Sequence, residues 1–228
     1  MSAAAEIADR GPGRVALVLA RHAAVGPPGI DPLAFADAAL ADTYEVLSEL
    51  VDVTAGIVGG APDAVADLLW PSDLGFPELG PAAVVHRLAK GSGPGGADNA
   101  VGQCVLVAAD VPDLPGLVLA KVFRALGRAD VVLAPARGEP GRLVALGVRV
   151  PWPAWVPDDL DLDDVDPEAL VALAPRRTAI AVGPDWHRLT SPGQTDRLDP
   201  GLEGWDNVRL VLAGARPRRS SPVPDDAG

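Results

Sequence analysis

The stretch QCVLVAADVPDLP at residues 103–115 decides the fold. A run of apolar residues ends at the carboxylate of Asp110, a second carboxylate follows at Asp113, and Pro115 opens an apolar segment with helical spacing. A continuous apolar run is typical of a strand buried on both faces of a parallel sheet, and a proline favours the start of a helix. Because open α/β sheets bind ligands at the carboxyl ends of their strands, Asp110 and Asp113 are positioned to meet a metal ion and a phosphate.

The same alternation of apolar runs and amphipathic segments extends along most of the chain. Asp31 followed by Pro32 has the pattern of a helix start, with the aspartate as N-cap. The alternation favours one α/β domain with a mostly parallel central sheet flanked by helices. The expected strands are 15–20, 53–58, 103–109, 129–135, 142–150 and 179–182, and the expected helices are 31–51, 62–69, 81–89, 115–126, 167–174 and 205–213, with an irregular segment at 70–80.

Length and composition favour a single soluble domain. The chain has 228 residues, of which 48% are hydrophobic, and we expect a flexible lead-in at 1–13, the domain at 14–214 and a disordered tail at 215–228. Neither a signal peptide nor an apolar run long enough to span a membrane is visible, so we expect a cytoplasmic protein. The single cysteine excludes an intramolecular disulfide.

The charge balance excludes some partners. The formal net charge is −12, whereas a protein that holds nucleic acid or an anionic membrane needs a basic face. We therefore expect neither a nucleic acid nor a membrane as partner. A phosphate-bearing small molecule would need a cation beside it to neutralise its charge.

Four residues are candidate metal ligands. Carboxylates at a strand end, such as Asp110 and Asp113, bind hard cations such as Mg²⁺ or Mn²⁺ through oxygen. Asp185 and His187, in the stretch Asp185-Trp186-His187 after the last short strand, could add an oxygen and an imidazole nitrogen. The alternatives are structural: Asp113 could cap the helix that begins near Pro115, and a single Asp-x-His is a weak signal.

Two glycine-bearing loops are candidate ligand contacts. The loop after the first strand carries Arg21, His22 and Gly26, and its backbone N–H groups and basic side chains could bind the phosphates of a nucleotide. The turn at 137–147 contains glycines that let a backbone approach a ligand, although an ordinary turn between two strands explains it as well. The acidic stretch 158–166 lacks the spacing of a calcium loop, and we expect it to be a solvated loop.

The stretches VLVAADVPDLP, LAKVFRAL and ADVVLAPARGEPGRLVALGV together resemble a bacterial domain family of unknown function. This family is glycosyltransferase-A-like and is related to the molybdenum-cofactor and phospholactate nucleotidyltransferases. The resemblance is best over 105–150, looser over 15–89 and thin after 151. It implies a Rossmann-like nucleotide-diphospho-sugar transferase fold, a metal at Asp110, and metal-assisted attack on a nucleoside diphosphate or triphosphate.

The chain departs from the family pattern at its ligand-binding elements. The family's first loop carries a lysine and an arginine, whereas this loop keeps only Arg21. In the glycine-rich element the usual aspartate is Glu139 and the usual tyrosine is Arg142. The Asp-x-Asp-Thr-Pro element near the C-terminus is absent or reduced to Asp185 and its neighbours.

These observations support two principal hypotheses. The first is a metal-dependent glycosyltransferase or nucleotidyltransferase with a nucleotide or nucleotide-sugar donor over the first loop and the acceptor near Glu139, Gly141 and Arg142. The second is a non-catalytic member of the same fold that acts as a binding or scaffold module. A third, a dinucleotide binder, lacks the expected Gly-x-Gly-x-x-Gly after the first strand.

Overall fold

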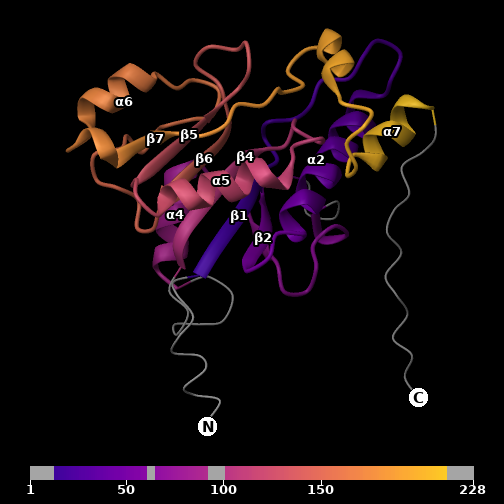
Figure 1. The fold of residues 1–228 in the computed structure, drawn as a ribbon. Coiled ribbons are helices and arrows are strands. Elements are labelled where there is room, and N and C mark those ends of the chain that lie inside the picture. Colours follow the sequence, from indigo (N-terminus) through magenta and orange to yellow (C-terminus); the bar gives the residue numbers. More distant parts are fainter. Residues whose placement is uncertain (1–12, 61–64, 92–100, 215–228) are drawn as a thin grey trace, which may run out of the picture.

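The computed structural model describes residues 13–60, 65–91 and 101–214, and these residues form one seven-stranded sheet with helices on both faces (Figure 1). The strand order is β3-β2-β1-β4-β6-β5-β7. The elements in chain order are β1 (Gly13–Leu19), α2 (Pro32–Ser48), β2 (Val53–Val58), β3 (Leu74–Phe76), α4 (Pro81–Ala89), β4 (Val101–Ala108), α5 (Gly116–Leu126), β5 (Val131–Pro135), β6 (Leu143–Arg149), α6 (Pro167–Leu173), β7 (Ile180–Val182) and α7 (Asp206–Leu212), with short 3₁₀ turns at Arg177–Ala179 and Pro192–Arg197.

The sheet is parallel except at β6, which runs antiparallel to both β4 and β5. The link from β5 to β6 is too short for a crossover, so the two strands form a hairpin. Gly138 and Gly141 adopt positive φ angles of 77° and 79° in this turn, a conformation that glycine reaches without strain. The expected mostly parallel sheet, flanked by helices, is confirmed.

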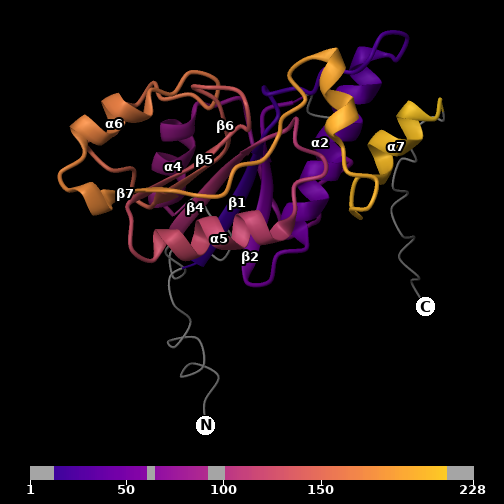
Figure 2. The same ribbon diagram turned by 45° about the horizontal axis from the view of Figure 1, so that its top comes forward.

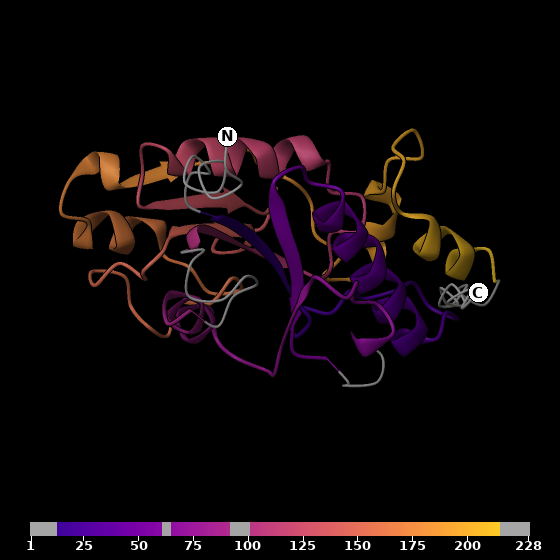
Figure 3. The same cartoon turned by 90° about the horizontal axis from the view of Figure 1, so that it is seen from below.

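The sheet separates two layers of apolar packing. On one face, Ala16 and Val18 of β1 and Val105 and Val107 of β4 pack with α2 and α5. On the other face, their alternate neighbours, such as Leu17, pack with α4 and with the segment 152–165. Figure 1 and Figure 3 show α5 and α4 on opposite sides of the sheet. This two-sided burial explains why the central strands read as unbroken apolar runs.

Most expected elements match the structure, and one prediction was wrong. The Asp31 carboxylate accepts hydrogen bonds from the N–H groups of Leu33 and Ala34 and caps α2, as its sequence pattern indicates. The segment 70–80, expected to be irregular, contains β3, which pairs with the end of β2. The expected lead-in, the start of the helix at 62–69 and the tail lie at least in part outside the described residues. No helix in the described part of the chain is long and apolar enough to cross a membrane.

The helices α6 and α7 lie at opposite ends of the molecule (Figure 2). The short helix α7 packs beside α2, where Val208 and Val211 join a third apolar cluster with Phe35 and Leu189. Leu189 belongs to the segment that follows β7, so this cluster fixes that segment beside the loop after β1. The loop after β1, the loop after β4 and the segment after β7 therefore lie together at the carboxyl ends of the central strands.

Candidate functional site

The candidate site lies at the carboxyl ends of β1 and β4. The chain leaves β1 for β2 and β3 on one side and returns to pair β4 with the other side of β1. A crevice at such a reversal of strand order is the usual ligand site of an open α/β sheet. The loop after β1 contributes Arg21 and His22, and the loop after β4 contributes Asp110 and Asp113.

Asp110 is held by an arginine that the sequence analysis did not predict. Nε of Arg188 donates to both carboxylate oxygens of Asp110, at 2.8 and 3.0 Å, and both side chains are 1% exposed. Burial raises the pKa of Asp110 to about 6, and the Arg188 guanidinium limits the rise. The carboxylate is therefore ionised near neutral pH and is neutralised by a guanidinium.

The backbone around Arg188 crosses the carboxyl ends of β1 and β4. The N–H of Leu189 donates to the carbonyl of Asp110 at 2.9 Å, and the carbonyl of Leu189 accepts from the N–H of Val25 at 2.7 Å. The segment after β7 therefore ties the end of β4 to the loop after β1. Because Leu189 is fully buried, the chain itself fills the space between these two loops at this point.

A chain of charges continues from Arg188 to the surface. Nη1 of Arg188 donates to Oδ1 of Asp163 at 2.6 Å, and the other oxygen of Asp163 lies 2.9 Å from Nδ1 of His22. Nη2 of Arg21 lies 2.7 Å from Oδ2 of Asp161. The acidic stretch 158–166 is therefore not simply solvated, because two of its aspartates bind the basic residues at the strand ends.

His22 is buried within this network. Its side chain is 2% exposed, and burial, the largest influence, lowers its pKa although Asp163 and Asp161 act in the opposite direction. The hydrogen bonds assign the tautomer: Nε2 accepts from Nε of Arg21 at 3.3 Å, so Nδ1 carries the proton and donates to Asp163. Arg188 and His22 in turn hold the pKa of Asp163 below its ordinary value, against the opposing effect of burial.

The four expected metal ligands do not meet around one point. Both oxygens of Asp110 are bound to Arg188, and both oxygens of Asp185 are bound to Arg137 at 3.0 and 3.1 Å on the surface. Mg²⁺ and Mn²⁺ need several open oxygen ligands. These residues in this arrangement do not fit such an ion.

Asp113 and His187 form a separate buried pair. Asp113 accepts from the indole N–H of Trp186 at 3.1 Å and from the backbone N–H of Asp199 at 3.2 Å. Nε2 of His187 lies 3.0 Å from Oδ1 of Asp113, but its direction does not make a hydrogen bond. The Asp113 carboxylate thus joins the loop after β4 to two later segments, and it does not cap α5, whose N-cap residue is Pro115.

Among the described residues, the group that brings three possible ligand atoms within 4.8 Å of one another is His22, Asp161 and Asp163. The same carboxylates bind Arg21 and Arg188. The two guanidiniums oppose a further cation there.

Gly26, expected to approach a nucleotide, has a packing role in the structure. A Cβ atom at this position would lie 2.8 Å from the ring of Phe35, so a side chain would displace that buried ring. Of the three expected nucleotide-binding residues, Arg21 and His22 face the network at the strand ends. Both are engaged by aspartates of the acidic stretch.

The three expected acceptor-binding residues do come together. Glu139, Gly141 and Arg142 line a cavity of about 470 Å³ beside the hairpin turn, closed on the other side by Val165 and Pro167. Glu139 accepts from Arg142 at 3.0 Å, and Thr190 and Gln194 each donate to it at 2.8 Å. The mostly apolar lining suits the carbon skeleton of a small molecule.

Arg188, Asp161 and Asp163 are the site residues that the sequence analysis missed. One signal for the aspartates was present. In Leu160-Asp161-Leu162-Asp163 the apolar residues alternate with acidic ones, which is typical of an extended segment buried on one side. The leucines of this stretch are buried in the core and the aspartates face the strand ends.

Comparison with solved structures identifies the fold. A putative nucleotide-diphospho-sugar transferase from Desulfovibrio desulfuricans G20 superposes with a TM-score of 0.55 at 16% identity, over 89% of this chain and 96% of that one. A 4-diphosphocytidyl-2C-methyl-D-erythritol synthase gives 0.51 at 15% identity over 89% and 100%, and one from Anaerococcus prevotii DSM 20548 gives 0.51 at 10% over 89% and 96%. No known family model and no curated sequence matches the chain. The chain therefore has the nucleotide-diphospho-sugar transferase fold.

Proposed function

We propose that this chain is a nucleotide-binding module that has kept the transferase fold without a catalytic metal at the strand ends. The observation that carries the proposal is the buried pair of Asp110 and Arg188, with its two contacts of 2.8 and 3.0 Å. Arg188 supplies the positive charge that a metal ion would otherwise bring to this carboxylate. Since an arginine stays charged at any ordinary pH, this charge is permanent.

A metal ion would have to displace Arg188 to reach Asp110. The guanidinium would then lose Asp110, Asp163 and the carbonyl of Leu143 at once, in a place where its side chain is 1% exposed. Breaking a buried ion pair costs about 3–5 kcal/mol. Divalent-metal catalysis at Asp110 is disfavoured by that cost.

The nucleotide part of the proposal rests on the position of three basic side chains. Arg21, His22 and Arg188 gather at the reversal of strand order, where α/β sheets bind ligands. An arginine binds phosphate oxygens directly, through the same donors that it offers to a carboxylate. The cavity at Glu139, Gly141 and Arg142 could receive a group attached to the nucleotide.

Calorimetric titration tests the proposal. The wild-type protein would be titrated with CTP, GTP, UDP-glucose and GDP-mannose, once with Mn²⁺ and once with EDTA. We expect binding of at least one nucleotide that is the same in both buffers. Binding that requires Mn²⁺, or no binding at all by a folded protein, would contradict the metal-free module.

A metal-dependent transferase is the second candidate. It is favoured by the group of His22, Asp161 and Asp163, which has the ligand types for a divalent ion. If the chain is a metal-dependent transferase, Mn²⁺ should bind the wild-type protein in the absence of a nucleotide, and the substitution His22→Ala should abolish that binding. The metal-free module expects no Mn²⁺ binding in either protein, so one metal titration separates the two.

A further inference from the structure

The aspartates that cover the basic residues occupy the place of an anion. Oδ1 of Asp163 lies 2.6 Å from Nη1 of Arg188, and Oδ2 of Asp161 lies 2.7 Å from Nη2 of Arg21. Nδ1 of His22 donates to the second oxygen of Asp163. These are the donors and distances that a phosphate group would use, so the two carboxylates stand in for phosphate oxygens.

While Asp161 and Asp163 contact the basic residues, the charge of the group disfavours an anionic ligand. Three carboxylates, Asp110, Asp161 and Asp163, face two guanidiniums, Arg21 and Arg188, so the carboxylates outnumber the guanidiniums by one. An anion would be repelled while both carboxylates are in place. The cations become available only if Asp161 and Asp163 turn away.

The two side chains lie at the surface, whereas the backbone beside them is held by hydrogen bonds. Their exposed fractions are 36% and 44%, so solvent is open to both carboxylates. The backbone beside them is fixed, because the carbonyl of Leu162 accepts from Leu143 at 2.8 Å and the N–H of Val165 donates to Gly141 at 2.7 Å. Leu162 is also fully buried. The backbone is therefore anchored beside two carboxylates that reach solvent, and a turn of Asp161 gives up one bond, which its Oδ1 accepts from the N–H of Asp163 at 3.1 Å.

We propose that Asp161 and Asp163 form an acidic latch that competes with a phosphate-bearing ligand for Arg21, His22 and Arg188. The latch rests on the proposed function, since it regulates access to the same nucleotide site. A diphosphate can replace two carboxylates with several oxygens at once. Binding then exchanges contacts within the chain for contacts with the ligand, so the latch lowers affinity and selects ligands that carry more than one phosphate group.

The latch is tested with the double substitution Asp161→Asn and Asp163→Asn. Asparagine keeps the size of aspartate and an oxygen that can accept the Asp163 N–H, which now donates to Asp161 at 3.1 Å. The two bonds between Arg188 and Asp110 do not involve the substituted residues, so we expect the buried pair to remain. Far-ultraviolet circular dichroism and thermal unfolding check that the variant is folded.

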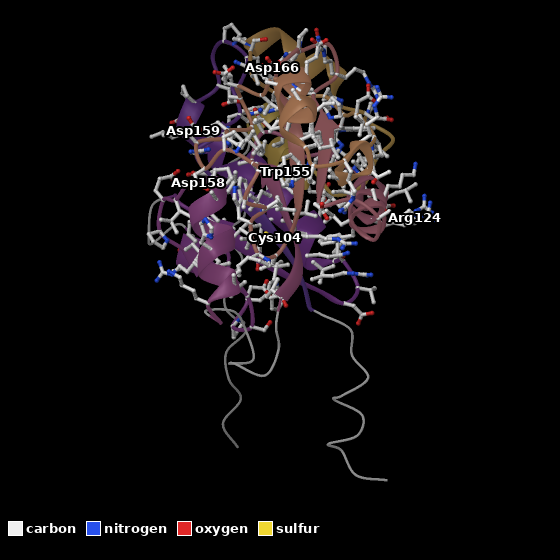
Figure 4. All side chains as sticks on the ribbon, turned by 90° about the vertical axis from the view of Figure 1, so that its left-hand side faces the viewer. Cys104, Arg124, Trp155, Asp158, Asp159 and Asp166 are labelled. Atoms are coloured by element: carbon white, nitrogen blue, oxygen red, sulfur yellow. The ribbon has the colours of Figure 1, made fainter. Side chains whose placement is uncertain are left out.

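The matched control is the double substitution Asp158→Asn and Asp159→Asn. It removes the same charge from the same acidic stretch, but these side chains are exposed and lie at the surface (Figure 4). Asp158 lies 3.7 Å from His86 and contacts none of the three basic residues. The control therefore measures the effect of net charge without a change at Arg21, His22 or Arg188.

The probes are CTP and inorganic pyrophosphate, titrated calorimetrically in EDTA at low salt. We expect the Asp161/Asp163 variant to bind both about tenfold more tightly than wild type or better, and the control to stay within about threefold, because only the first variant removes direct competitors. Equal affinities in all three proteins would overturn the latch and leave the nucleotide module standing.

The two probes separate the latch from the nucleotide module. Pyrophosphate binding that strengthens only in the Asp161/Asp163 variant, without binding of CTP to any protein, would support the latch and overturn the nucleotide module. An equal gain in both variants would attribute the effect to net charge and overturn the latch. No binding of either probe to any of the folded proteins would overturn both proposals.

Discussion

Asp110 at the end of β4 and Asp42 in α2 are two carboxylates buried to almost the same degree, with exposed fractions of 1% and 0%. Asp110 is bound to the guanidinium of Arg188. In the described part of the chain Asp42 pairs with no cation: it accepts from the backbone N–H groups of Asn207 and Val208 at 3.0 and 2.9 Å and from the Asn207 side chain at 2.8 Å. A buried aspartate is thus stabilised by an ion pair in one place and by N–H donors in the other.

The difference shows that burial of a carboxylate does not by itself indicate a ligand site. Asp42 satisfies the first N–H groups of α7 and fastens that helix to α2, which is a capping role. Burial raises the pKa of Asp42 to about 7, higher than that of Asp110, because hydrogen bonds from Val208 and Asn207 oppose the effect at Asp42 whereas the Arg188 guanidinium opposes it at Asp110. The partner of each carboxylate, rather than its depth, decides what it does.

The largest expected effect is that of Arg188→Met. Removing the guanidinium leaves Asp110 buried without a counter-charge, so we expect the free energy of unfolding to fall by about 3–5 kcal/mol at neutral pH. Equilibrium unfolding in urea measures the change. Adding Asp110→Leu to this variant removes the stranded charge and is expected to recover most of the loss.

The double variant Arg188→Met with Asp110→Leu serves as the control for this prediction. If Arg188→Met cost less than about 1 kcal/mol, or if Asp110→Leu made the variant still less stable, the pair would not be the buried centre described above. Asp163 does not complicate the comparison, because its side chain is 44% exposed and water replaces the lost guanidinium there.

The sequence predicted the fold well where apolar runs are unambiguous. The ranges 53–58 and 81–89 agree with β2 and α4 residue for residue. The sequence did not reveal β3, because three residues that include Gly75 are too few to show an alternating pattern. The antiparallel direction of β6 follows from the short link after β5, a constraint that composition does not display.

The candidate site was predictable only in part. The position of Asp110 at a buried strand end followed from the apolar run before it. Its partner did not, because Arg188 lies 78 residues further along the chain and local patterns carry no information on such pairs. The sequence also could not show that Gly26 is required for packing and not for ligand binding. A side chain at this position is excluded by the ring of Phe35, which contacts the loop only after α2 has packed on it.

An intermediate effect is expected for Asp42→Ala. The substitution removes three hydrogen bonds and the cap of α7, which should lower the free energy of unfolding by about 1–3 kcal/mol at pH 5. Hydrogen exchange should show the loss concentrated in α7 and in the part of α2 beside it. Uniform loss over the whole sheet would argue against a local capping role.

The cost of Asp42→Ala should also depend on pH. The folded-state pKa of about 7 lies above the ordinary value of about 3.9, so the folded state binds the proton more tightly than the unfolded chain. The stabilisation from this group is complete below about pH 4 and is lost as the pH rises to about 7, by at most ~1.4 kcal/mol per pH unit. The difference between wild type and variant should therefore be smaller at pH 8 than at pH 5. A difference that grows with pH would contradict the raised pKa.

The smallest effect is expected for Arg137→Ala. This substitution breaks the surface pair of Arg137 and Asp185, whose bond lengths are similar to those of the buried pair of Arg188 and Asp110. Arg137 and Asp185 are 56% and 51% exposed, and the guanidinium also lies 5.6 Å from the ring centre of Trp186. Because water solvates both charges and salt screens them, we expect a loss below about 1 kcal/mol that shrinks further at high salt. Unfolding in urea at low and high salt measures both quantities. If Arg137→Ala lowered the free energy of unfolding as much as Arg188→Met, burial would not be the reason why the pair of Asp110 and Arg188 stabilises the protein. A small loss would show that the greater stabilisation by that pair comes from the exclusion of water at the strand ends.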